Sequence, residues 1–242
     1  SCVHFASLQE ALEANVVVVR EHQAVAVELM DKNVLDLTLD NATQRQNRFF
    51  VEGDPAALLL IEWAGDSEEA VRAQAQVLES DLRQRGMGYT YPQVAGDDIA
   101  RVWALRKAGL GVLGNMKGDA KPVSLIEDTA VRVEDLPAYV AELDVLLTAY
   151  GKSCVYHGHA GSGELHIRPV LNLRQSEDVR LFRQIALDTA RLVKKYKGSL
   201  SGEHGDGRLR GEFIPLMVGA ENYALMQRVK QVFDPLGLFN PG

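Results

Sequence analysis

A chain of 242 residues can form one large domain or two lobes that share a core. Its composition, 46% hydrophobic and 24% charged residues, is ordinary for a globular protein, and no apolar run is long enough to span a bilayer. The net charge of −7 argues against nucleic-acid binding, because phosphate recognition needs a basic surface.

The first half of the chain alternates between strand and helix patterns. Short apolar runs at residues 24–29 and 56–63 predict strands. Residues 70–82 carry apolar side chains at helical spacing, and Gly86 is placed to end that helix. Residues 87–94 predict a further strand.

The second half repeats this order of elements without repeating the sequence. Its predicted elements are an extended segment at 121–131, a helix at 136–150, two strands within 155–170, and helices at 179–196 and 221–233. The last helix is expected to bury Leu225, Val229 and Val232. Two helices packed on one face of a largely antiparallel sheet, formed twice, predict an α+β fold of two ferredoxin-like halves.

The segment VYHGHAGSGELHIRPV carries three histidines around a glycine-rich turn. A two-residue turn at 162–163 predicts a hairpin in which His159 lies opposite His166, and His157 opposite Arg168. The other strand face is expected to enter a core through Tyr156, Leu165, Ile167 and Leu171. Opposed Cβ atoms lie roughly 4.5–5.5 Å apart, so the two imidazoles could bind one divalent metal. The alternative is a solvated sheet face with incidental histidines.

A second cluster, SLSGEHGDGRLRG at residues 199–211, places Glu203 and His204 in a glycine-rich loop. Neighbouring side chains of an extended chain point in opposite directions, so Glu203 could bind a metal while His204 faces a substrate. Two histidines and one carboxylate leave coordination positions open for a substrate oxygen. The alternative is a solvated surface loop.

Two cationic residues, Arg106 and Lys121, are candidates for binding a carboxylate. Arginine offers a planar fork of donors, and lysine offers a point charge. Each could equally be one of the ordinary surface cations, since the chain has 26 lysines and arginines.

Three motifs, GHAGSGELH at 158–166, SLSGEHGDGRLRG at 199–211 and VFDPLGLFNPG at 232–242, occur in this order. They resemble the C-terminal cap domain of FAD-linked oxidases of the vanillyl-alcohol oxidase superfamily. The branch is that of glycolate oxidase, D-lactate dehydrogenase and D-2-hydroxyglutarate dehydrogenase. The resemblance covers nearly the whole chain. We therefore expect residues 1–242 to form this one domain, cut from a longer protein whose N-terminal FAD-binding domain is absent from the sequence.

The resemblance implies oxidation of a 2-hydroxy acid to a 2-oxo acid, with hydride transfer to FAD held mainly by the separate domain. Metal-dependent members bind zinc or manganese through residues that match His159, His166 and Glu203. The histidine that follows the glutamate, here His204, is the base. Arg106 and Lys121 match the residues that bind the substrate carboxylate. The fragment alone is expected to be inactive.

The sequence departs from the family pattern at Ser162, Glu164 and Arg168, where many relatives carry Asp, Asn and Asn. We expect Arg168 to bind a second substrate carboxylate, as in 2-hydroxyglutarate, or else to pair with Glu164 or Glu203. The variant most resembles large fused proteins in which iron–sulfur modules follow the oxidase. Such modules are therefore expected partners, and the uncovered cap could form a homodimer.

Two other functions fit the residues. Two histidines and a glutamate would also suit a metal-dependent hydrolase, although the sequence has no His-Glu-x-x-His helix. The ferredoxin-like halves could instead form a non-catalytic assembly module.

The chain has two cysteines, Cys2 and Cys154. So few thiols without a bridge pattern are typical of a reducing compartment. We expect both thiols to be reduced and the protein to be cytoplasmic.

Overall fold

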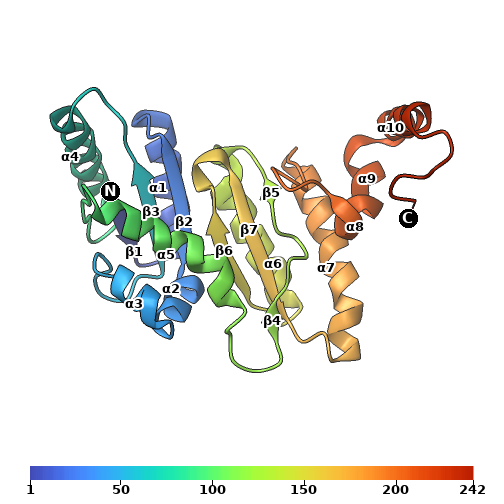
Figure 1. The fold of residues 1–242 in the computed structure, drawn as a ribbon, viewed down its shortest axis with the longest axis horizontal. Helices are drawn as coiled ribbons and strands as arrows, with labels where there is room; N and C mark the ends of the chain where they lie inside the picture. Colours follow the sequence, from blue (N-terminus) through green and yellow to red (C-terminus); the bar gives the residue numbers. More distant parts are fainter. Residues whose placement is uncertain (242) are drawn as a thin grey trace.

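The computed structural model describes residues 1–241 (Figure 1). Its elements are, in chain order, β1 (Cys2–Phe5), α1 (Leu8–Glu21), β2 (Ala26–Asp31), α2 (Lys32–Leu39), α3 (Ala42–Asn47), β3 (Ala57–Glu62), α4 (Glu68–Arg85), α5 (Asp98–Leu113), β4 (Lys121–Pro122), β5 (Thr129–Ala130), η1 (Val133–Asp135), α6 (Leu136–Ala149), β6 (Cys154–Gly158), η2 (Ala160–Ser162), β7 (Glu164–Leu171), α7 (Ser176–Lys195), α8 (Gly207–Arg210), η3 (Gly211–Phe213), α9 (Ile214–Val218) and α10 (Ala220–Phe233). Within this range, none of the helices has both the length and the apolar character that crossing a bilayer requires.

The described strands form one sheet in the order β1-β3-β2-β6-β7-β4, with β5 also paired to β7. Every pairing is antiparallel. In the first half the order is β1-α1-β2-β3-α4, and Thr90, after α4, forms a bridge with His4 of β1. In the second half the order is β5-α6-β6-β7-α7, and Ser199, after α7, forms a bridge with Ala130 of β5. The halves meet where Leu29 and Met30 of β2 pair with β6. The predicted α+β fold of two ferredoxin-like halves is confirmed.

Four helices, α1, α4, α6 and α7, cover one face of the sheet as expected and build the larger core with Leu12, Leu78, Tyr139 and Ile185 among its members. The structure adds helices to the other face of the first half. There α2 and α5 contribute Val34 and Leu105 to a second core against Leu58 of β3. The reason lies in β3 itself, whose uninterrupted apolar sequence suits a strand that is buried on both faces.

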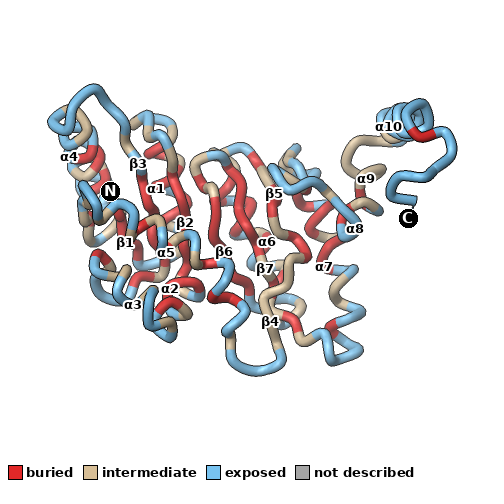
Figure 2. The backbone as a smooth tube through the Cα atoms, in the orientation of Figure 1, coloured by how far each residue is buried: buried red, intermediate tan, exposed pale blue. Residues whose placement is uncertain are grey.

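The last helix, α10, lies beyond α7 and α9 at one end of the molecule (Figure 2). The prediction that it buries Leu225, Val229 and Val232 is wrong, because these side chains are 54%, 59% and 75% exposed. Helical spacing correctly indicates an apolar face, but spacing alone cannot show what covers that face.

Residues 87–94 do not form the strand that the sequence predicts. They run beside β1 and make an isolated bridge between Thr90 and His4. Gly88 has a φ of +78°, and Pro92 has no N–H to donate, so a regular ladder cannot continue through this segment.

Asp31 ties the two halves together at the end of β2. Its carboxylate accepts hydrogen bonds from the N–H groups of Val34, at the start of α2, and of Tyr156, on β6, at 3.0 and 2.9 Å. Burial raises the pKa of Asp31 to about 6, although these hydrogen bonds favour the charged form.

We expect Asp31 to lower the stability of the protein as the pH rises from about 4 to 6. In this window the unfolded chain has released the Asp31 proton while the folded protein still binds it, so the free energy of unfolding falls. The contribution of this group between pH 4.5 and 7.5 is about 2 kcal/mol. Asp31→Asn should remove it, so the stability of wild type relative to the variant should decrease by that amount in urea titrations.

The matched control is Asp36→Asn, which changes an exposed carboxylate on α2. The loss of stability between the two pH values should persist in Asp36→Asn, because the buried Asp31 carboxylate is still present. A constant difference for Asp31→Asn would contradict the assignment.

Candidate functional site

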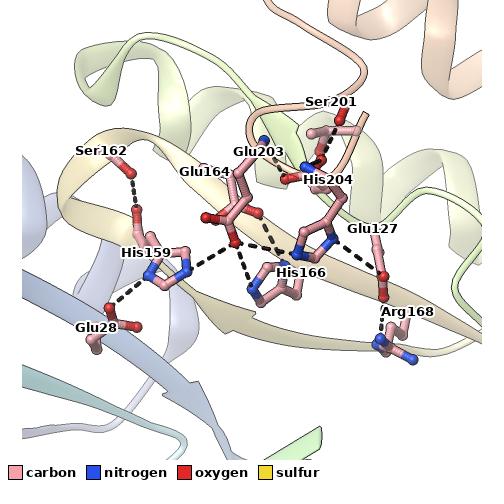
Figure 3. Close-up of polar contacts among 12 residues, drawn as sticks. Glu28, Glu127, His159, Ser162, Glu164, His166, Arg168, Ser201, Glu203 and His204 are labelled. Atoms are coloured by element: carbon pink, nitrogen blue, oxygen red, sulfur yellow. Dashed lines mark hydrogen bonds and ion pairs between the residues drawn. The ribbon is translucent and has the colours of Figure 1, made fainter. Parts of the chain in front are cut away.

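Three imidazoles and one carboxylate meet on the sheet face opposite to the four-helix layer (Figure 3). His159 follows β6, His166 lies on β7, and Glu203 and His204 belong to the loop before α8. One oxygen, Glu203 Oε1, lies 3.3 Å from His159 Nε2, 3.9 Å from His166 Nε2 and 3.3 Å from His204 Nε2. The structure therefore brings together four residues that the sequence singles out in two separate segments.

The register of the β6–β7 hairpin differs from the prediction by two residues. His157, and not His159, lies opposite His166, and Arg168 lies opposite Val155. The turn is longer than two residues because it contains the 3₁₀ helix η2. A shift of two keeps every side chain on its expected face. Tyr156, Leu165, Ile167 and Leu171 accordingly lie in the core, and the His159 and His166 rings are still only 5.3 Å apart.

The loop that carries Glu203 and His204 is held by Asp128, a fully buried residue just before β5. Its carboxylate accepts hydrogen bonds from the N–H of Glu203 at 3.0 Å, from the N–H of His204 at 2.9 Å, and from the Ser201 hydroxyl. Burial opposes the charged form, but these hydrogen bonds outweigh it and lower the pKa of Asp128. The carboxylate therefore stays ionised and fixes the loop backbone.

Gly202 allows this loop to approach the hairpin closely. A Cβ atom at this position would lie 2.8 Å from Glu164 Cγ, which is too close for an ordinary contact. A larger residue would push Glu203 away from the histidines.

The outer nitrogen of each imidazole faces a further carboxylate. His159 Nδ1 lies 2.7 Å from Glu28 and His166 Nδ1 lies 3.1 Å from Glu164. His204 Nδ1 lies 3.6 Å from Glu127. All three rings thus turn Nδ1 toward a glutamate and Nε2 toward Glu203.

The environment gives two of the buried histidines different charge preferences. Burial lowers the pKa of His157 to about 3, and the neighbouring His166 and Arg168 add to this effect. Burial also acts to lower the pKa of His166, but the Glu164 carboxylate outweighs it and the pKa is raised. His157 is therefore neutral at physiological pH, and its buried Nε2 has no hydrogen-bond partner within residues 1–241.

The three candidate substrate-binding cations all have protein partners. Arg106 pairs with Glu28 at 2.6 Å. Arg168 pairs with Glu127 and donates to Ser124, so its partner is neither of the two glutamates named from the sequence.

Lys121 lies apart from the cluster and donates to the carbonyl of Met116. Its strand partner, Leu171, is five residues along β7 from His166, a distance of roughly 16 Å. The structure therefore does not bring Lys121 together with the histidines.

The donor set fits a divalent metal. One ligand atom each from His159, Glu164, His166 and Glu203 lie within 4.8 Å of one another. Ligands of a tetrahedral zinc ion are separated by about 3.3 Å, so small side-chain rotations would close the cluster around an ion. A second group of ligand atoms within 4.8 Å of one another comes from Asp128, His166, Glu203 and His204.

An open cavity of about 260 Å³ adjoins the cluster. It is lined by Ala130, His159, Ser162, Glu164, Gly202 and Glu203. The cavity therefore gives small molecules access to His159, Glu164 and Glu203.

Sequence reasoning misses the acidic residues that support the cluster, namely Glu28, Glu127 and Asp128. The sequence does contain a signal that could have identified these acidic residues. Glu28 interrupts the apolar strand β2, and the Glu127–Asp128 pair directly follows an apolar run before β5. A charged residue in a buried strand needs a partner, which makes such positions candidates for polar networks.

Comparisons with known proteins agree with the motifs. The sequence profile described as "FAD linked oxidases, C-terminal domain" matches residues 1–242. The D-2-hydroxyglutarate dehydrogenase of Pseudomonas putida is 35% identical over 99% of this chain, and that of Escherichia coli is 36% identical over 92%. The chain spans 24% and 23% of the length of these relatives.

A solved structure shares the fold. The 4-ethylphenol oxidase from Gulosibacter chungangensis, solved with isoeugenol, superposes with a TM-score of 0.59 at 14% identity, covering 100% of this chain and 52% of the oxidase. The fold, the ordered motifs and the full-length profile match lead to one conclusion: the chain belongs to the C-terminal domain family of FAD-linked oxidases.

Proposed function

We propose that this chain is the substrate-binding cap of a flavin-dependent D-2-hydroxy acid dehydrogenase. The curated relatives at 35% and 36% identity are named D-2-hydroxyglutarate dehydrogenases, which supports this substrate class. FAD, held mainly by a separate domain, would accept the hydride from the substrate α-carbon.

The arrangement around Glu203 carries the proposal. Carboxylates accept hydrogen bonds but do not donate them, so Glu28, 2.7 Å from His159 Nδ1, favours a proton on that nitrogen. The Nδ1 atoms of His166 and His204 face glutamates at 3.1 and 3.6 Å, and the negative charges there favour the same tautomer. The Nε2 atoms then direct their lone pairs toward Glu203 Oε1, which is itself negative. Such a cluster of lone pairs is relieved either by a second proton on an imidazole or by a bound cation, and the proposal places a cation there.

His159, His166 and Glu203 are the proposed metal ligands. A zinc or manganese ion bound there would polarise the substrate hydroxyl and lower its pKa. His204 would accept the hydroxyl proton, and Glu127 beside its Nδ1 would stabilise the resulting imidazolium.

The proposal assigns substrate carboxylate binding to Arg106 and Lys121, and a second carboxylate to Arg168. Arg106 uses Nε and Nη2 for Glu28, which leaves the remaining edge of its guanidinium for a second partner. Arg168 would have to share or release Glu127. Lys121, whose strand partner lies roughly 16 Å along β7 from His166, would have to move toward the cluster to take this role. Binding these groups would orient the α C–H bond for transfer.

The proposal includes iron–sulfur modules as electron acceptors and a cytoplasmic location. Both cysteines of the chain are buried and free, which suits a reducing compartment.

His159→Ala and Glu203→Ala should each lower the zinc or manganese content of the full-length protein by at least about tenfold, because each removes a ligand. Elemental analysis of the purified proteins measures this directly. His22→Ala is the control, since His22 pairs with Asp81 outside the cluster and its loss should leave the metal content unchanged. Wild-type metal content in both ligand variants would end the assignment.

His204→Gln should lower kcat for a D-2-hydroxy acid by about 10²–10⁴-fold while the metal content stays at the wild-type level. Steady-state assays with an artificial electron acceptor, paired with elemental analysis, separate the two effects. Simultaneous loss of metal and activity would instead make His204 a ligand, as the second donor group allows.

A further inference from the structure

Glu28 divides its carboxylate between two partners. Oε2 accepts from Arg106 Nε at 2.8 Å and lies 2.6 Å from Arg106 Nη2, and Oε1 lies 2.7 Å from His159 Nδ1. Arg106 comes from α5 and His159 from the turn after β6, so three separate segments meet at this carboxylate.

Glu28 and Arg106 are both largely buried, which restricts the orientations that the Glu28 carboxylate can adopt. The Glu28 side chain is only 8% exposed and that of Arg106 only 18%. A buried carboxylate needs compensating partners, and an arginine that donates from two nitrogens fixes its orientation. The second oxygen is thereby held at the place where His159 Nδ1 lies.

The contact determines which nitrogen of His159 carries the proton. Arg106 Nη2 lies 3.4 Å from His159 Nδ1 and, as a donor, would favour the tautomer without a proton on that nitrogen. Glu28 Oε1 can only accept and is much closer, at 2.7 Å, so it favours the tautomer with the proton on Nδ1. That tautomer leaves the Nε2 lone pair directed toward Glu203, 3.3 Å away.

The backbone brings His159 to this position. β2 and β6 pair with Leu29 opposite Gly158, and one step further along this register places Glu28 beside His159. The turn packs directly on β2, since a Cβ atom at Gly161 would lie 3.1 Å from Val27 Cβ. The turn therefore sits against the strand that carries Glu28.

We propose that Glu28 and Arg106 are positioning residues for the metal centre: Arg106 orients Glu28, and Glu28 fixes the ring and tautomer of His159. This inference deepens the proposed function and rests on His159 being a metal ligand. Arg106 then acts on the centre through Glu28, in addition to any contact with substrate. A carboxylate behind a ligating histidine typically raises metal affinity 10- to 100-fold.

The test is a double-mutant cycle on cobalt(II) binding to the full-length protein, followed by visible absorption. Glu28→Gln and Arg106→Gln should each weaken cobalt binding about 10- to 100-fold. In the Glu28→Gln background, Arg106→Gln should have little further effect, because both act through one contact. Fully additive effects, or wild-type affinity in either single variant, would overturn the inference.

The matched control is Arg101→Gln. Arg101 also lies on α5, but it is 42% exposed and pairs with Asp98. It should bind cobalt like wild type, and circular dichroism of all variants separates weakened binding from misfolding.

A second readout does not depend on any metal. Histidine-selective ¹⁵N NMR of the metal-free protein should show His159 protonated on Nδ1 in wild type and a mixture of tautomers in Glu28→Gln. If wild type binds no cobalt but Glu28→Gln still changes the His159 tautomer, the proposed metal centre is wrong, while the positioning contact between Glu28 and His159 is supported. An unchanged His159 tautomer in Glu28→Gln would overturn the inference itself.

Discussion

The hydrogen bonds between the buried Asp128 carboxylate and the loop N–H groups of Glu203 and His204 are the interaction on which the rest of the site depends. The loop follows α7 and is paired with the sheet by a bridge between Ser199 and Ala130 and by the hydrogen bond from the Gly202 N–H to the Asp128 carbonyl, but this ladder does not extend to residues 203–204. There the Asp128 side chain replaces the ladder with charge-assisted hydrogen bonds in a buried setting. Because neighbouring residues of the loop are fixed together, one anchor places both a ligand candidate and the proposed base.

Two of the remaining carboxylates of the site are neutralised by arginines, whereas the buried Glu164 faces His166, whose pKa it raises. Glu28 is matched by Arg106, and Glu127 by Arg168. Each glutamate also faces the Nδ1 atom of one histidine, His159 or His204. Unpaired charges at this depth would be strongly unfavourable, whereas paired ones can orient imidazoles without accumulating charge beside the centre. Arg106 and Arg168 thus stabilise the glutamates of the site, whether or not they also bind substrate groups.

The sequence predicts the parts of this protein that depend on local pattern. Alternation along the hairpin places Leu165 and Ile167 in the core, and a register error of two residues leaves that result intact. The turn length was not predictable, because a 3₁₀ turn after His159 has no strong local signature. The exposure of α10 could not be predicted from the sequence either, because apolar residues at helical spacing do not show whether another element covers them. The local pattern marks Glu28 and Asp128 as charges in apolar surroundings, but it does not identify their partners, which lie more than 70 residues away in the sequence.

The two halves meet along β2 and β6 over the pairs at Leu29 and Met30, whereas β2 pairs with β3 along its whole length from Ala26 to Asp31. The proposed metal ligands all belong to the second half, and Glu28 belongs to the first. The contact between Glu28 and His159 is therefore the point at which the first half reaches the proposed centre. A small displacement of β2 relative to β6 would change the support of His159 while every ligand remained within the second half.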